Sequence, residues 1–488
     1  MAYSCMTSAS EFLSVSFYSS DIMGTTYQPS EIVLQCKKVF KNIIAYDKFD
    51  FDGKKESMYA LRPAFDTVAD MIGKGKKVPE SLLEIFAQNP EYSAKLDSLI
   101  NAKDKVPFKI FDKKNAEKLF GKNLNISASQ LEKFNLCRFS YFCNYGLNVR
   151  ERQRAEINPM QYGTIVHYIL ERFFGEYTKE EYLSLEEDKF QKIVCAHLAE
   201  YAVKYFGEEQ LESNSFTYRL KTILDNVMYL MKHIMEELSQ SEFFVADCEL
   251  KIGEDIPSYT IVLPDGHKIA VCGSVDRVDI MQRADITYLR IIDYKTGTKQ
   301  FKLSDILYGI NLQMLLYLHS IEASGGDKYG EIVPAGILYM PATVPYISSD
   351  SLKSIDKLPD ELNKKLKMNG LLLKDTEIIH GMDKTDVATY IPVKIKAGEP
   401  VSSTSLATLA EFGKIFKKVD MLIAEMGKNI YNGNIEAKPL KGGHDSCEYC
   451  PYDSVCAYRQ SNPITCFSVD NKAVIEEITN EINGKEEE

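Results

Sequence analysis

Two neighbouring segments, 273–279 and 291–297, carry acids and a lysine at the spacing of β-strands. Side chains two residues apart in a strand face the same side, so Asp293 and Lys295 project together into the space that Asp276 also reaches. Paired acids suit a divalent metal, Mg2+ or Mn2+, that activates water against a phosphodiester. The ammonium group can orient the nucleophile or offset charge on the phosphoryl oxygens. Taken alone, such a triplet is more often a surface ion pair or a turn.

An amphipathic helix is expected at 164–174, where apolar residues recur at helical spacing after Gly163. His167 lies on this helix. A histidine in such a setting is more often a satisfied core or boundary residue than a metal ligand. Glu171 follows one turn later on the same face, where it would either accept the imidazole N–H or be solvated.

The cysteines provide a second candidate site. Cys447, Cys450 and Cys456 form a C-x2-C-x5-C pattern beside Pro451, which can place three thiolates around one metal centre. Three local sulfurs and a fourth from elsewhere fit either zinc or an iron–sulfur cluster. Most of the other cysteines, of 11 in the chain, are expected to pack as small buried side chains.

Composition is that of an ordinary globular protein, with 488 residues, 45% hydrophobic and 26% charged. Unpaired cysteine spacing and the absence of an evident secretory signal favour the cytoplasm. A net charge of −12 argues against a free-standing, high-affinity DNA-binding role, since a basic surface is the usual footprint. One basic group is equally compatible with a strand-entry surface and with a solvated face: Lys133, Arg138, Arg150, Arg152 and Arg154. No G-x4-G-K-[ST] pattern occurs, so ATP hydrolysis is not expected.

The elements expected along the chain follow from periodicity and turn residues. The N-terminal part should hold a β-like run at 12–17, a helix from Pro29 through Phe40, and a helical connector over 46–122. Further on, helices should dominate 176–240, strands 245–295, a helix 305–322, a strand 335–340, loops with short strands 341–400 and a long helix 403–431. The domains expected are 1–45, 46–122, 123–466 and an acidic tail at 467–488.

Several motifs occur in a fixed order: Ile126–Glu132 leading to Cys137, Gly163–His167 with Glu171, Val275–Asp279, Asp293–Lys295, Gln313–Tyr317 and Cys447–Cys456. In this order they resemble the RecB-like branch of the PD-(D/E)XK nucleases, and most closely the C-terminal nuclease region of the AddB subunits of bacterial helicase-nucleases. The resemblance implies an α/β fold with a restriction-endonuclease-like core, a mixed central sheet flanked by helices, helical insertions and an Fe–S staple. Residues 1–45 would then be a remnant of a helicase-like region.

Residue roles follow from the same resemblance. His167, Asp276, Asp293 and the backbone carbonyl of Tyr294 would hold the metal, and Lys295 would be the catalytic lysine. Gln313 and Tyr317 share one helix face and would contact the DNA strand or the lysine. Glu249 stands where relatives often carry a glutamate and is a possible neighbour of the active site.

For the cysteines, the resemblance implies a 4Fe–4S cluster completed by Cys137. Cys143 is a competing fourth ligand. Arg138 follows Cys137 where many relatives have proline. The cluster would join the start of the nuclease domain to its end, which removes entropy from the unfolded chain as a long-range crosslink does.

The function implied is a Mg-dependent DNA exonuclease that processes double-strand breaks for recombinational repair with an AddA-like helicase-nuclease partner, cutting the 5'-ended strand. Two alternatives stay open. A free-standing RecB-like single-strand exonuclease with an Fe–S cluster would cut without a partner, although the long N-terminal extension argues against it. A noncatalytic DNA-end clamp would keep the fold without turnover, although the complete set of His167, Asp276, Asp293 and Lys295 argues against that.

Overall fold

The structure is a computed structural model of the chain, and it falls into two compact units, Met1–Val106 and Pro107–Glu488. The residues that it describes are 6–18, 27–40, 43, 60–73, 76–101, 109–110, 112–150, 159–207, 214–297, 300–345, 358–402, 404–456, 458 and 463–486. None of the helices within these ranges is long and apolar enough to cross a membrane.

The first unit is helical where it is described. Helix α2 (Glu31–Val39) begins after Ser30, as expected, and none of its residues is buried. Helices α4 (Leu61–Gly73), α5 (Glu80–Gln88) and α6 (Ser93–Asn101) share a small apolar core that includes Val68 and Phe86. The β-like run expected at 12–17 is wrong: no strand forms there, and its large apolar side chains are exposed. A strand needs a neighbouring strand for its backbone hydrogen bonds, and among the described residues none pairs with it.

The second unit is built on a six-stranded mixed sheet in the order β11-β8-β7-β6-β5-β2. Strand β6 pairs with β7 in parallel, while β2–β5, β5–β6 and β7–β8 are antiparallel. A smaller sheet has the order β1-β4-β3, and β9–β10 and β12–β13 form two-stranded ladders. The strands are β1 (Asn123–Ile126), β2 (Phe244–Ile252), β3 (Thr260–Val262), β4 (Lys268–Val271), β5 (Gly273–Arg283), β6 (Ile286–Lys295), β7 (Glu331–Pro341), β8 (Asn369–Leu373), β9 (Lys394–Lys396), β10 (Glu399–Val401), β11 (Leu406–Ala407), β12 (Leu440–Gly442) and β13 (Ile464–Cys466).

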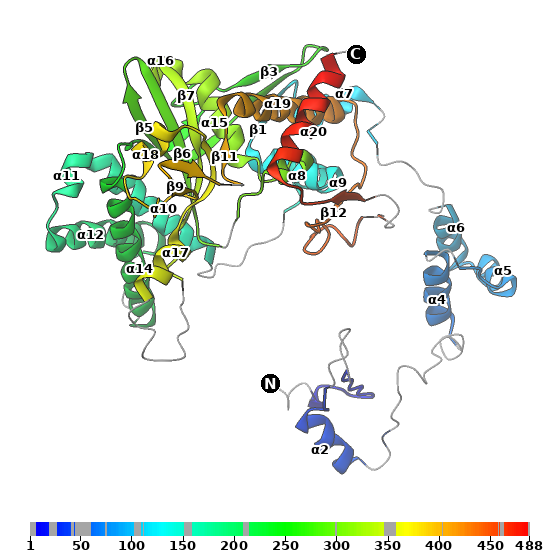
Figure 1. Ribbon diagram of the computed structural model, residues 1–488. Coiled ribbons are helices and arrows are strands. Elements are labelled where there is room, and N and C mark those ends of the chain that lie inside the picture. Colours follow the sequence, from blue (N-terminus) through cyan, green and yellow to red (C-terminus); the bar gives the residue numbers. More distant parts are fainter. Residues whose placement is uncertain are drawn as a thin grey trace. The chain divides into compact units, whose positions relative to one another are not determined.

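Helices flank the central sheet (Figure 1). They are α7 (Lys113–Phe120), α8 (Ala128–Leu136), α9 (Arg138–Tyr141), α10 (Pro159–Glu176), α11 (Lys179–Leu183), α12 (Glu187–Phe206), α14 (Asn214–Ser239), α15 (Gln313–Ser324), α16 (Gly326–Tyr329), α17 (Leu358–Leu366), α18 (Thr376–Met382), α19 (Leu409–Tyr431) and α20 (Asn471–Glu486), with a π-turn η2 (Phe142–Gly146) and a 3-10 turn η3 (Leu303–Tyr308). Arg290 and Asp293 of β6 lie an odd number of residues apart and therefore point to opposite faces. Arg290 meets Glu237 of α14 and Asp293 meets Gln313 of α15, so these two helices cover opposite faces of the sheet.

The mixed sheet flanked by helices confirms the expected fold class. Loops and short strands alone do not describe 341–400, because α17 and α18 lie there. The carboxylate of Asp375, which accepts hydrogen bonds from the backbone amides of Glu377 and Ile378, was the available indication of a helix start. The helix expected at 305–322 is broken in two, with η3 and α15 separated by residues 309–312.

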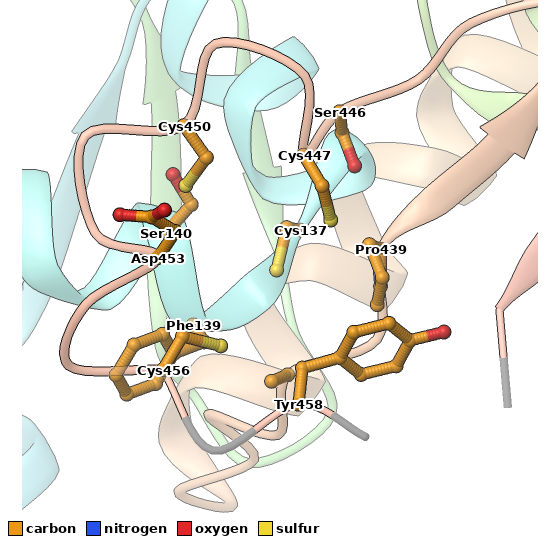
Figure 2. A pocket seen from close by; sticks show the side chains of 11 residues that line it. Cys137, Phe139, Ser140, Pro439, Ser446, Cys447, Cys450, Asp453, Cys456 and Tyr458 are labelled. Atoms are coloured by element: carbon orange, nitrogen blue, oxygen red, sulfur yellow. The ribbon is translucent and has the colours of Figure 1, made fainter. Parts of the chain in front are cut away.

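The end of the chain packs against the unit instead of forming a separate tail. Helix α20 lies against α19, and its Val474 and Ile478 are fully buried. Nearby, the segment after β12 brings its cysteines beside the start of α9 (Figure 2). Residues from the beginning and the end of the second unit thus meet at one place.

Candidate active site

The carboxylates converge where strands β5 and β6 separate. Regular pairing of the two strands ends at Arg277–Ile292, although both strands continue past this pair. Beyond it, the backbone amide of Tyr294 donates to the Asp276 carboxylate at 2.9 Å. The Asp276 side chain therefore occupies the space between the separating strands, with Asp293 on the adjacent strand.

Asp293 is buried and held by two side chains. Lys295 Nζ lies 2.5 Å from its Oδ2, and the Gln313 amide donates to its Oδ1 at 3.1 Å. Lys295 remains partly exposed, so its ammonium group can also reach a molecule in solvent. Asp293, Lys295 and Gln313 thus come together, as the sequence indicated.

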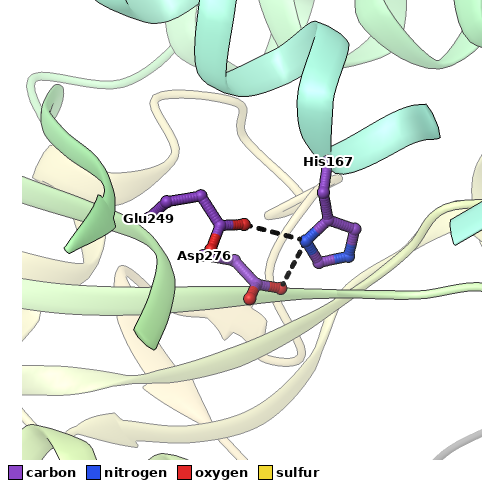
Figure 3. Close-up of side chains that lie close together, drawn as sticks. All are labelled: His167, Glu249 and Asp276. Atoms are coloured by element: carbon purple, nitrogen blue, oxygen red, sulfur yellow. Dashed lines mark hydrogen bonds and ion pairs between the residues drawn. The ribbon is translucent and has the colours of Figure 1, made fainter. Parts of the chain in front are cut away.

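His167 reaches the same carboxylates from α10. Its Nδ1 lies 3.1 Å from Glu249 Oε1 and 3.5 Å from Asp276 Oδ2 (Figure 3). Ligand atoms of His167, Glu249 and Asp276 all lie within 4.8 Å of one another, close enough to share one metal ion. Glu171 is exposed, and it is Glu249 that contacts the imidazole, so Glu249 takes the place considered for Glu171.

Glu249 has an unusual backbone for a strand residue. Its φ is +49°, in the left-handed region, and it sits between the pairs Cys248–Arg277 and Leu250–Val275 of the β2–β5 ladder. A non-glycine residue in this region costs free energy and persists only when its surroundings hold it. Here the Ser274 hydroxyl donates to Glu249 Oε2 at 2.8 Å, which together with His167 fixes the carboxylate.

The site carries more negative charge than its own cations balance. Burial, and then the charge of Asp293, raises the pKa of Asp276 to about 7. Burial lowers the pKa of His167, but the hydrogen bond to Glu249 and the charge of Asp276 outweigh it and raise the pKa to about 8. Carboxylates crowded in this way fit a divalent cation, whose charge would replace the missing positive charge.

Tyr317 is buried against the start of β5. The backbone amide of Ala128 hydrogen-bonds its hydroxyl group. A Cβ atom added to Gly273 would lie 2.3 Å from that hydroxyl oxygen, so only glycine fits at this position. Tyr317 and Gln313 both belong to α15, as expected, but Tyr317 packs on the strand that carries Asp276.

The opposite face of the sheet holds a buried ionic network that the sequence analysis missed. Arg277 and Arg290 contact both Asp279 and Glu237, and all of these side chains are fully buried. Arg277 also donates to the Tyr294 hydroxyl at 3.3 Å. The alternation of Arg277 and Asp279 with Asp276 was the sequence feature that could have revealed a charged layer behind the site.

The four cysteines proposed as ligands line one cavity of about 130 Å3 (Figure 2). They are Cys137, Cys447, Cys450 and Cys456, and none is in a disulfide. No three of their sulfur atoms lie within 4.8 Å of one another. Burial raises the pKa of the Cys137 thiol. Cys143 belongs to the same apolar cluster but does not line the cavity.

The basic group is only partly described. Arg138 points toward Glu425, with Nη2 and Oε1 3.4 Å apart, and its guanidinium lies over the Phe134 ring. Arg152 and Arg154 lie outside the described residues. Arg138 is therefore tied to α19, and the strand-entry surface stays a prediction.

Comparison with known proteins agrees with this geometry. The family model of the PD-(D/E)XK nuclease superfamily matches residues 125–457, and the chain belongs to this superfamily. It is also similar to proteins named as AddB-type subunits of an ATP-dependent helicase/deoxyribonuclease, which confirms the resemblance to AddB. The relative from Clostridium acetobutylicum is 30% identical over 99% of this chain and 43% of its own length. Those from Thermoanaerobacter sp. (strain X514) and Clostridium botulinum (strain Loch Maree) are 30% and 32% identical, each over 94% of this chain and 42% of their own length. The chain thus spans less than half the length of these relatives.

Proposed function

We propose that this chain is the nuclease-bearing part of a helicase-nuclease subunit and hydrolyses DNA phosphodiesters with Mg2+ or Mn2+. The observation that carries the proposal is the convergence of Asp276, Asp293 and Lys295 at the point where β5 and β6 separate. His167 and Glu249 complete a set of oxygen and nitrogen ligands on one side.

The residues that would hold the metal are His167, Asp276, Asp293 and the carbonyl of Tyr294. Glu249 either joins them or orients the His167 ring through its 3.1 Å contact. The bound ion would lower the pKa of a water molecule and offset charge on the phosphate. Gln313 keeps the Asp293 carboxylate in place, and the ammonium group of Lys295 donates to the attacking water or to a phosphoryl oxygen.

The biological setting is inferred from the names of the relatives and from the motifs. In that setting the chain works with an AddA-like helicase-nuclease subunit on DNA ends at double-strand breaks, for recombinational repair, and cuts the 5'-ended strand. A net charge of −12 fits a nuclease to which a partner delivers the DNA better than one that captures DNA alone.

The cysteine cavity is proposed to hold a 4Fe–4S cluster. A single zinc ion with sulfur ligands at about 2.3 Å in tetrahedral geometry brings those sulfurs to about 3.8 Å from one another. The sulfurs around this cavity are more widely spaced than that, which favours a larger metal centre. Anaerobically purified protein should show the broad visible absorbance of an Fe–S centre together with iron and sulfide. A colourless protein with stoichiometric zinc would contradict this assignment.

The test of the nuclease proposal is degradation of end-labelled single-stranded DNA in Mg2+, with and without an AddA-type partner. Asp293→Ala is compared with wild type and with Asp285→Ala, which removes an exposed aspartate from the turn between β5 and β6. Wild type and Asp285→Ala should cut, and Asp293→Ala should not. Cutting only with the partner identifies a subunit, and cutting without it a free-standing exonuclease. An inactive wild type under both conditions would support the noncatalytic clamp.

A further inference from the structure

The helix that carries Gln313 and Tyr317 is held from outside the active site by α8. Three positions on one face of α8 contact the beginning of α15. The Ala128 amide hydrogen-bonds the Tyr317 hydroxyl, the Glu132 carboxylate accepts from the Leu312 amide at 2.8 Å, and Asn135 donates to the Gly309 carbonyl at 3.1 Å. Residues 128, 132 and 135 follow the i, i+4, i+7 spacing of a single helix face.

The Glu132 contact satisfies a backbone amide that α15 leaves open. Leu312 is the N-cap residue of α15, and its own side chain offers no hydrogen bond to the helix start. The first amides of a helix have no partner within the helix, and a carboxylate placed there also favours the helix dipole. Gln313, whose amide holds Asp293, is the next residue. The direction of the Gln313 side chain therefore depends on a glutamate that lies outside the metal site.

The same short segment is gripped from its other side by the chain that leads to Cys447. Ile310 packs in an apolar cluster with Leu440, and the Leu440 carbonyl accepts from the Ser446 amide at 3.0 Å. Ser446 directly precedes Cys447. On the first side, α8 ends at Cys137, which is its C-cap residue. Residues 309–312 thus lie between two pieces of chain that each end at a cysteine of the cavity.

We propose that Glu132 and Asn135 are positioning residues that couple the cysteine site to the nuclease site, because they fix the start of α15 and through it Gln313 and Asp293. The proposal rests on the proposed function for its effect on cleavage, but its structural part does not need activity. Filling of the cysteine cavity would hold Cys137 and Cys447 in place, and hence α8 and the turn at 440–446. Residues 309–313 would then be more ordered in the filled protein than in the empty one.

The first arm of the test measures amide hydrogen exchange by mass spectrometry in the full chain. Glu132→Ala should speed exchange across 309–316, while Glu132→Gln, which keeps an acceptor oxygen, should stay near wild type. Glu181→Ala is the matched control, because Glu181 accepts from the Thr178 amide at 2.8 Å at the start of the remote helix α11. Cys456→Ala, which empties the cavity of one thiolate, should speed exchange in the same segment. Unchanged exchange at 309–316 in Glu132→Ala or in Cys456→Ala would overturn the coupling.

The second arm measures cleavage of single-stranded DNA in a double-mutant cycle. Displacement of a group near the reacting atoms can cost up to about 100-fold in rate. Glu132→Ala should therefore cut more slowly than wild type, with Glu132→Gln recovering most of the rate. In a Gln313→Ala background, Glu132→Ala should add little further loss, because both changes act through one contact. Full multiplication of the two losses would overturn the route through Gln313. If wild type does not cut at all, the proposed function fails and the exchange arm alone decides the coupling.

Discussion

The Tyr294 amide donates to the Asp276 carboxylate at 2.9 Å, a position where an unbroken β5–β6 ladder would offer a backbone carbonyl. The side chain of Asp276 thereby keeps the two strands at a fixed separation after their regular pairing has ended. The same contact places the Tyr294 carbonyl and Asp293 beside Asp276. This local separation of strands turns a sheet edge into a place for a metal ion.

Glu249 should control metal affinity. Replacement by glutamine removes a charge next to His167 and Asp276, and the loss of such a contact typically costs about 10- to 100-fold in metal affinity. The Mg2+ concentration for half-maximal cleavage should rise accordingly in Glu249→Gln. Glu254→Gln, an exposed glutamate just after β2, is the control. Equal Mg2+ dependence of the Glu249 variant and wild type would show that this carboxylate does not serve the metal.

Gly273 should tolerate no side chain. In Gly273→Ala the new methyl group would meet the Tyr317 ring and hydroxyl, and overpacking of this kind typically costs about 1–3 kcal/mol. Gly413→Ala, within α19 and with open space at its Cβ, should be neutral or stabilising. Urea unfolding measures both. Removal of the ring in a Gly273→Ala, Tyr317→Ala double variant should make the glycine change less costly, and strict additivity would refute the contact.

The buried network of Arg277, Arg290, Asp279 and Glu237 should be essential for stability. Glu237→Gln keeps the shape of the side chain but leaves an excess of buried positive charge. Breaking a buried ion pair in this way costs about 3–5 kcal/mol. Thermal unfolding should show a large drop in Tm. Glu236→Gln, the neighbouring residue on α14, is the control and should unfold near wild type.

His319 should make stability depend on pH in the alkaline range. Burial lowers its pKa, but the hydrogen bond to Asp420 at 3.1 Å and the nearby Glu322 raise it to about 9. A folded-state pKa above the unfolded value of 6.5 stabilises the fold fully below pH 6.5, and this contribution is lost as pH rises toward 9. The Tm of wild type should therefore fall more between pH 6.5 and 9 than the Tm of His319→Gln. Parallel pH profiles of the two proteins would contradict the assigned pKa.

The residues that meet across two adjacent strands could be predicted from the sequence. Asp276, Asp293 and Lys295 lie on strands joined by a short turn, so period-two alternation places them together. Glu249 could not be assigned with the same certainty, because its role depends on a left-handed backbone inside a strand. The contact between Glu132 and Leu312 joins residues 180 positions apart, and no local pattern specifies it. The break between η3 and α15 was missed for a related reason, since its apolar residues continue the helical spacing.

The most direct test of the central claim separates metal binding from cleavage in two variants of one strand. Mn2+ binding by calorimetry and cleavage of end-labelled single-stranded DNA are measured for Asp293→Ala and Lys295→Ala under conditions where wild type cuts. The account predicts that Asp293→Ala loses both metal binding and cleavage, whereas Lys295→Ala still binds the metal and loses cleavage. Cleavage near the wild-type rate by either variant would contradict the assignment of this site.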